Sequence, residues 1–396
     1  MGRIWREVGW IDSTEQAKAL EYFLQDATGY VAEIRGAPEV SVTAHAGLTR
    51  YIDRDLPMWG ITSVTVSRIA RKQGFAGTLT ARLLAEGAER GSAIAMLGMF
   101  DQGYYDRLGF GTGSYERYLS FDPASLLVEG APRPPRRVEN GHFGPLHAGV
   151  VAGQKRHGSS WFPEANALRA EMEWTKNAFG LGYFTEDESM LTHFLWGEAK
   201  DENGPYEVYF YSYRNDEEFL ELLRVIKSLG DQVHGIRMKE PPGIMLQDFL
   251  EKPFKQRRQT RDGVFASRHS AQAYWQLRIL DMEAAIAACT GTTELDFTAS
   301  IRDPVTPYLT DRKGWQGAGG TWEIHLGETS RARRLHAEPA AGPSIVTDIG
   351  SLSRLWFGAA SARSLALQGR LQADPETVAA LDSYFRLPEP HPWWDF

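Results

Sequence analysis

The sequence predicts an α/β (α+β) protein that builds mixed sheets in more than one domain, and three observations lead to this fold class. Apolar, β-branched runs typical of strands alternate along the chain with stretches whose apolar residues recur at helical spacing. The chain has 396 residues, enough for two or three domains that each bury a core. Residues 129–137 combine prolines with charges, which is the composition of a linker.

The first part of the chain shows strand and helix signals in alternation. We expect a first strand at residues 3–9 and then a helix capped near Ser13. Two antiparallel strands follow at residues 29–34 and 40–48, joined by the turn at residues 36–38.

Residues 60–113 contain the most informative pattern. A buried strand with Ile61 is followed by a loop, residues 68–77, that combines three basic side chains with two glycines. Apolar residues at helical spacing then run to Gly91, so the loop leads into a helix N-terminus, which favours an anion such as a diphosphate. The chain has neither the G-x-x-x-x-G-K-[ST] pattern nor a G-x-G-x-x-G after a strand, which argues against P-loop and Rossmann nucleotide sites.

The loop sequence Arg71-Lys-Gln-Gly-Phe-Ala76 resembles the (Q/R)-x-x-G-x-(G/A) acetyl-CoA loop of the GNAT N-acetyltransferases. After a second strand at residues 93–99, the stretch GYYDRLGFG at 103–111 is similar to the Y-x-R-(F/Y)-G-(Y/F)-G segment of the Eis-type (enhanced intracellular survival) acetyltransferases. The resemblance implies that Tyr105 is the general acid that protonates the CoA sulfur; the alternative is a packing aromatic. It implies acetyl-CoA as co-substrate, bound by Val64, Val66, Arg71, Lys72, Gln73, Gly74, Phe75, Ala76 and Gly77.

Three domains follow from this division of the chain. The first, residues 1–128, binds acetyl-CoA and is closed by a strand at 115–121. The second, residues 138–287, repeats strands and helices, but its corresponding loop at 211–218 is acidic and without glycine, so it would repel a diphosphate. This suits the second GNAT-like domain of Eis-type proteins, which does not bind CoA.

The last domain, residues 288–396, is expected to be α+β. It is entered through a W-x-R-(L/I)-L-D segment within residues 274–281, which is similar to the entry of the sterol-carrier-like domain in Eis-type proteins. Strands at 294–301 and 320–326 are followed by three predicted helices.

The chain ends in Trp393-Trp-Asp-Phe396, an aromatic end that must dock or cost solubility. By the resemblance, the α-carboxylate of Phe396 reaches the active site and helps to deprotonate the acceptor, with Asp395 and Trp394 binding it. The alternative is a tail docked only for stability. Other candidate bases are His45, Asp53 and Asp55.

Composition limits the partners. The formal charge of −8 argues against nucleic acid and is compatible with a cationic small molecule. The single cysteine, Cys289, excludes an internal disulfide, and His142, His147 and His157 lack the companions of a metal site. With no apolar run of about 18 residues and no signal-peptide pattern, we expect a cytoplasmic protein without a membrane partner.

The resemblance thus implies an acetyl-CoA-dependent N-acetyltransferase acting on a multi-amine acceptor, either aminoglycoside-like, a polyamine or lysine. It also implies a homo-oligomer, a hexamer in Eis-type proteins. The segment between the first two strands, which forms one acceptor wall in GNAT folds, is shorter here, and Phe100 stands where Eis-type proteins have a serine. Two alternatives stay open: an acyltransferase for longer acyl-CoA or peptide acceptors, and a non-enzymatic scaffold that keeps the loop for packing.

Overall fold

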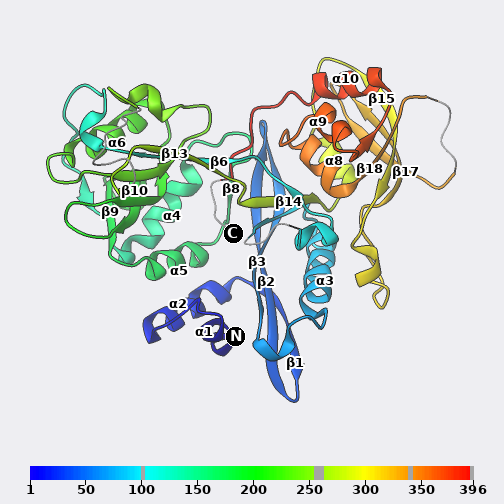
Figure 1. The fold of residues 1–396 in the computed structure, drawn as a ribbon, viewed down its shortest axis with the longest axis horizontal. Helices are drawn as coiled ribbons and strands as arrows, with labels where there is room; N and C mark the ends of the chain where they lie inside the picture. The colour runs from blue at the N-terminus through cyan, green and yellow to red at the C-terminus, as the bar shows by residue number, and fades with distance from the viewer. Residues whose placement is uncertain (100–102, 254–262, 338–341, 393–396) are drawn as a thin grey trace.

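The computed structural model describes residues 1–99, 103–253, 263–337 and 342–392, and it contains three mixed sheets. In Figure 1 the first sheet stands in the centre of the molecule, the second at the left and the third at the right. Each sheet contains one parallel pair, β3 with β4, β11 with β12 or β15 with β18, among antiparallel neighbours. The predicted α/β (α+β) class is confirmed.

The first sheet places the long hairpin of β2 and β3 beside helix α3, Phe75–Glu89 (Figure 1). The predicted strand, loop and helix of residues 60–91 are all present. The order in the described part of this sheet is β1-β2-β3-β4-β14-β5, and β8 pairs with β2. Its strands are β1 Thr28–Ile34, β2 Ala37–Tyr51, β3 Arg54–Val66, β4 Ile94–Gly98, β5 Gly111–Thr112, β8 Ser160–Trp161 and β14 Trp275–Ile279.

The strand expected at residues 3–9 is wrong, because residues 2–7 form helix α1, Gly2–Glu7. The neighbours Ile4 and Trp5 are both buried, whereas successive residues of a strand point to opposite faces. Helix α2, Thr14–Gln25, begins as predicted, since Ser13 Oγ accepts a hydrogen bond from Gln16 N at 3.1 Å. Helix α2 packs against α5, Asn166–Trp174, from the middle of the chain.

The second sheet has the order β13-β6-β12-β11-β10-β9-β7 in the described residues. Its strands are β6 Glu116–Phe121, β7 Arg136–Arg137, β9 Ala178–Phe184, β10 Leu191–Ala199, β11 Tyr206–Ser212, β12 Ile236–Lys239 and β13 Arg268–Gln272. Helices α4, Phe143–Ala152, and α6, Asp216–Ser228, pack against it, and α5 packs against α4.

The first and second sheets exchange strands. Strand β6, which was expected to close the first sheet, pairs with β12 and β13 in the second. In return, β14 leaves the middle region of the sequence and lies between β4 and β5. The predicted domain limits at residues 128, 138 and 287 stay a prediction, because each of these two sheets contains strands from both predicted domains.

The third sheet has the order β17-β16-β15-β18-β19 in the part of the chain that is described. Its strands and helices lie close to the predicted positions. They are α7 Met282–Ala287, β15 Leu295–Arg302, β16 Gly320–Leu326, β17 Arg331–Leu335, β18 Ser344–Asp348, α8 Ile349–Trp356, α9 Ala362–Leu367, β19 Leu371–Gln372 and α10 Pro375–Tyr384. None of the helices in the described residues is long and apolar enough to span a bilayer.

A buried ion pair joins the first and third sheets. Arg278 Nη2 of β14 lies 2.7 Å from Asp303 Oδ2, just beyond β15, and both side chains are 0% exposed. Arg278 Nη1 also donates to the carbonyl of Leu108. The carboxylate of Asp303 also accepts hydrogen bonds from the backbone N–H groups of Val305, at 3.1 Å, and Ala318, at 2.8 Å. The pair therefore fixes a turn of the first domain against two loops of the third.

We predict that Asp303→Ala lowers the free energy of unfolding by about 3–5 kcal/mol, because it leaves the guanidinium of Arg278 buried without its counter-charge. Urea unfolding measures this change. Glu323→Ala is the matched control, since it removes an ion pair to Arg333 whose partners are 54% and 71% exposed, and should cost about 1 kcal/mol or less. A loss for Asp303→Ala as small as that of the control would contradict the prediction.

Candidate active site

Strands β3 and β4 separate at the centre of the first sheet. Their parallel pairing runs from Met58 opposite Ile94 to Ile61 opposite Leu97, while β3 continues to Val66 paired only with β2 among the described strands. The register with β2 also shifts at this point, and Ser63 has a φ of 56°. A non-glycine residue in the left-handed region is uncommon and marks a bulge here. On the side of β4, residues 62–66 therefore have no strand partner among the described residues.

Val64 and Val66, predicted to contact the pantetheine and thioester, lie half-buried on this open stretch of β3. Ser63 and Val64 both line a cleft of about 470 Å³, described below. No sequence pattern predicts the bulge at Ser63, because a register shift depends on the neighbouring strand.

The loop after β3 presents free backbone N–H groups. Gly74 is the N-cap of α3 with a φ of 83°, and no side chain caps the helix. The N–H groups from Arg71 to Gly77 donate to none of the described residues. Lys72 adds a second left-handed residue, with a φ of 61°. Such strain costs of order 1 kcal/mol and is found at functional sites. The loop is open for an anion at a helix N-terminus.

The predicted side chains of this loop differ in position. Arg71, Lys72 and Gln73 are exposed, whereas Ala76 and Gly77 are buried in the first turn of α3 and Phe75 is half-buried. Gln73 Nε2 donates a hydrogen bond to the carbonyl of Ile69 at 2.8 Å. The exposed positive charge next to it comes from Arg71 and Lys72.

Tyr308 is a residue of the loop's surroundings that sequence reasoning missed. It ends the 3-10 helix η6, Thr306–Tyr308, in the third domain. A Cβ added at Gly77 would lie 3.0 Å from Tyr308 Cε1, so this ring covers the first turn of α3. Gly77 is required here by close approach.

Tyr105 begins the 3-10 turn η2, Tyr105–Leu108, and is 3% exposed. Its ring packs edge-on against Tyr104 at 4.9 Å and lies 6.1 Å from Phe110. Its hydroxyl makes no hydrogen bond to a described residue, and the residue lines the same cleft as Val64. Burial raises the pKa of Tyr105 above the ordinary value, so the phenol is protonated at neutral pH.

One wall of the cleft is aromatic. It comes from α1, the turn after it, α2 and α5, which Figure 1 shows below the second sheet and beside the hairpin. Trp5 contacts Trp10 at 5.1 Å, Phe23 at 6.0 Å and Trp174 at 5.7 Å between ring centroids. We name the rings of Trp5, Trp10, Phe23 and Trp174 the aromatic wall. Glu171 also lines the cleft. Two tryptophans in the first ten residues were a signal that sequence reasoning did not use.

The predicted tail residues Trp394, Asp395 and Phe396 lie outside the described residues, as does Phe100. The described chain leads toward them between the first and second domains. Pro390 O accepts a hydrogen bond from Ser114 Oγ at 2.6 Å, and Pro392 O accepts one from Lys239 Nζ at 2.7 Å.

The alternative bases His45, Asp53 and Asp55 are not among the residues that line the cleft. His45 is buried between Phe23 and Phe162, and burial lowers its pKa to about 4. Asp53 and Asp55 lie at the end of β3 that is opposite to Val64, and Asp55 pairs with Arg50 at 2.6 Å.

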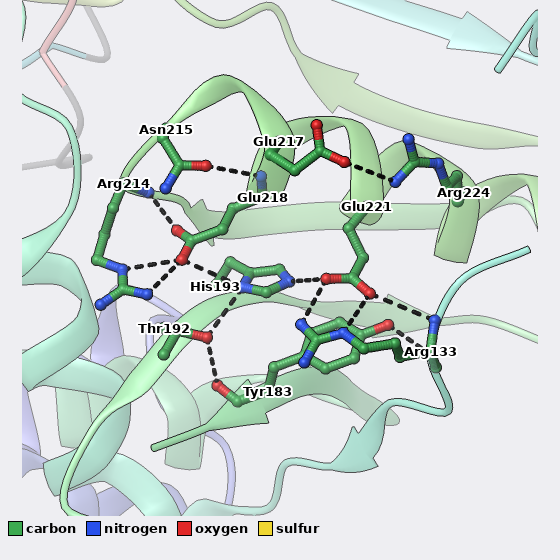
Figure 2. Close-up of polar contacts among 10 residues, drawn as sticks. All are labelled: Arg133, Tyr183, Thr192, His193, Arg214, Asn215, Glu217, Glu218, Glu221 and Arg224. Carbon is green, nitrogen blue, oxygen red and sulfur yellow. Dashed lines mark hydrogen bonds and ion pairs between the residues drawn. The ribbon is translucent and has the colours of Figure 1, made fainter. Parts of the chain in front are cut away.

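Figure 2 shows the polar contacts around the start of helix α6 in the second domain, where the sequence places the counterpart of the predicted acetyl-CoA loop. Glu218, in the first turn of α6, accepts a hydrogen bond from Arg214 N at 2.7 Å, and Asn215 Oδ1 caps the helix. His193 Nε2 lies 2.9 Å from Glu221, which also binds Arg133. Carboxylates occupy this helix N-terminus, so we expect no diphosphate there.

Comparisons with known proteins agree with this geometry. Residues 12–113 match an acetyltransferase (GNAT) domain, and residues 275–395 match a sterol carrier protein domain. An uncharacterised N-acetyltransferase of Streptomyces avermitilis is 25% identical over 395 residues, which cover 92% of this chain and 84% of that protein.

Solved structures share the whole fold. A probable N-acyltransferase of Enterococcus faecalis V583 is 18% identical with a TM-score of 0.77, and covers 99% of this chain and 95% of its own. Eis1 of Mycobacterium abscessus is 16% identical with a TM-score of 0.75, over the same shares of the two chains. The protein is thus an acetyltransferase with a GNAT domain at residues 12–113 and a sterol carrier protein domain at residues 275–395, and it shares the fold of Eis1.

Proposed function

We propose that the protein transfers the acetyl group of acetyl-CoA directly to a primary amine, with both substrates bound at once. The observation that supports this most is the cleft beside β3, which brings the open strand edge, Val64 and Tyr105 together. The free N–H groups of residues 71–77 lie in the loop that follows the same strand.

The donor would bind through its diphosphate at the loop. Backbone N–H groups from Arg71 to Gly77 and the N-terminus of α3 supply hydrogen bonds and positive potential, and Arg71 and Lys72 add charge. The pantetheine would follow the open edge of β3 past Val66 to Val64. There, a backbone N–H group can bind the thioester oxygen and stabilise the charge that develops on it.

The reaction also needs two proton transfers, one to the leaving thiolate and one from the attacking amine. The neutral amine attacks the thioester carbon, a C–N bond forms, and the C–S bond breaks as the electron pair returns to sulfur. Tyr105 is positioned to give its proton to the departing thiolate. The phenolate then recovers a proton from solvent.

The amine's own proton requires a base, and we propose the α-carboxylate of Phe396 acting through a water molecule. A free α-carboxyl has a pKa of about 3.5, so burial beside aromatic rings would have to raise it. Asp395 and Trp394 would hold the acceptor's ammonium group. The ordered course of the chain to Pro392 supports a docked tail.

For the acceptor we propose a multi-amine compound: aminoglycoside-like, a polyamine or a lysine side chain. The aromatic wall supports this, because ring faces bind ammonium groups by cation–π attraction while one amine reacts. Glu171 lines the cleft beside the rings and adds negative charge. A cytoplasmic location remains a prediction from the sequence pattern, and assembly into a hexamer remains a prediction of the family resemblance.

The donor site is tested by thermal unfolding with CoA. At about 100 times the dissociation constant, ligand binding should add about 2.7 kcal/mol to stability. Arg71→Gln combined with Lys72→Gln should weaken CoA binding, whereas Arg331→Gln, an exposed residue of β17, should leave it unchanged. A protein that CoA does not stabilise would contradict the proposal.

Tyr105→Phe should lower kcat by about 100-fold or more, because it removes the proton donor and little else. A chain that lacks Asp395 and Phe396 should lose activity on the amine to a similar degree. Release of free thiol measures both, with the unfolding midpoint as the control for folding. If both variants keep full turnover, the acid and the base are assigned wrongly.

The pH dependence of kcat/KM gives a further check on Tyr105. Its raised pKa keeps the proton on the phenol as the pH increases. The value of kcat/KM should therefore increase as the amine loses its proton, and it should begin to fall only above about pH 10. A decline centred between pH 7 and 9 would contradict Tyr105 as the acid.

Trp10→Ala should raise KM for a polyamine such as spermidine about fivefold, with kcat nearly unchanged, since an exposed cation–π contact contributes about 1 kcal/mol. Trp10 is 45% exposed, so its removal should not affect folding. The control is Tyr209→Ala, an aromatic residue of β11 that is 39% exposed and lies away from the cleft. An unchanged KM in Trp10→Ala would show that the aromatic wall does not bind the acceptor.

A further inference from the structure

A second cleft, of about 400 Å³, lies where the first domain meets the third, and its lining includes Asp106 and Arg107 of η2. Four guanidinium groups line it, against two carboxylates. The arginines are Arg107 from η2, Arg302 from the end of β15, Arg354 from α8 and Arg370 from the turn before β19, and the carboxylates are Asp106 and Asp348. We name this site the arginine cleft.

Arg354 is the central residue of the arginine cleft. It is half-buried, its Cγ packs against β5 near Gly111, and its Nε is buried without a hydrogen-bond partner. Its guanidinium forms no ion pair with any described residue. Burial lowers the pKa of Arg354, which shows that its environment offers the charge too little compensation. An arginine partly removed from water normally has an acceptor.

The other charges of the arginine cleft do not supply that acceptor. Asp348 is engaged as the N-cap of α8, where it accepts Ser351 N at 2.9 Å, and its nearest guanidinium contact is Arg370 at 3.7 Å. Asp106 accepts a hydrogen bond from Gln276 Nε2 at 2.9 Å. Arg107 and Arg302 form no ion pair with the described residues. The site therefore has a surplus of positive charge in a protein whose formal charge is −8.

We propose that the arginine cleft is a binding site for a phosphate-type oxyanion, either inorganic phosphate or the phosphate group of a small phosphomonoester. Guanidinium groups match the oxygens of phosphate in pairs, and Arg354, Arg370 and Arg107 approach the cleft from different elements. The ligand would join the first and third domains.

The position of the site suggests a consequence for activity. Asp106 and Arg107 directly follow Tyr105 in η2, so an anion bound to Arg107 would hold the turn that carries the general acid. This regulatory step rests on the proposed function, whereas binding of the anion does not.

The experiment measures binding of inorganic phosphate to the full chain by calorimetry, at constant ionic strength with chloride as the reference anion. We expect saturable binding that becomes at least tenfold weaker in Arg354→Gln and in Arg370→Gln. Arg331→Gln, in the same domain on β17 at the opposite edge of the third sheet, should bind like the unchanged protein. Arg370 has a side chain that is 55% exposed, so its variant tests the site even if Arg354→Gln fails to fold.

The acetyl-CoA loop is a rival phosphate site, and the combined Arg71→Gln and Lys72→Gln variant separates the two. The proposal requires that this variant binds phosphate normally. If the loop variant loses binding and Arg370→Gln keeps it, or if phosphate binds no better than chloride, the proposal is overturned. Adenosine monophosphate in the same series identifies the source: tighter binding than phosphate with the same dependence on Arg354 and Arg370 indicates a phosphomonoester, and equal binding indicates free phosphate.

Discussion

The buried ion pair between Arg278 and Asp303 fixes how the first and third domains meet and holds the turn that carries Tyr105, the proposed proton donor. Arg278 reaches the first sheet on a strand that comes from the middle of the sequence, and it binds the carbonyl of Leu108 at the end of the turn that Tyr105 begins. Because a charge pair inside the protein is tolerated only with good geometry, all three segments have one arrangement. The third domain is thus a support for the active site as well as an addition to it.

The proposed acetyl-CoA site depends on backbone N–H groups that have no hydrogen-bond partner among the described residues. Strand β3 leaves β4 after Ile61, and the loop that follows holds its N–H groups away from other described residues. Such groups favour a bound anion, since each gains a partner on binding. Left-handed Lys72 and the bulge at Ser63 are local strain that the rest of the sheet stabilises.

Two helix N-termini in one chain show how side-chain charge distinguishes the proposed binding site at α3 from its counterpart at α6. Helix α3 begins at Gly74, without a capping side chain and after two basic residues. Helix α6 has Asn215 as its N-cap and three acidic residues in its first turn, of which Glu218 binds Arg214, while Arg133 binds Glu221 in the next turn (Figure 2). Both have the same backbone dipole, and the side chains decide whether an anion from outside or a carboxylate of the protein compensates it.

The sequence by itself determined the elements and chemistry that depend on neighbours in the chain: the Ser13 cap, helix α6, the glycine-containing loop and the turn with Tyr105. The tertiary structure alone decided the exchange of β6 and β14, the aromatic wall around Trp5, and Tyr308 over the loop. Helix α1 shows the reason: a short segment such as residues 2–7 satisfies helix and strand patterns almost equally, and burial of Ile4 and Trp5 against distant residues decides between them.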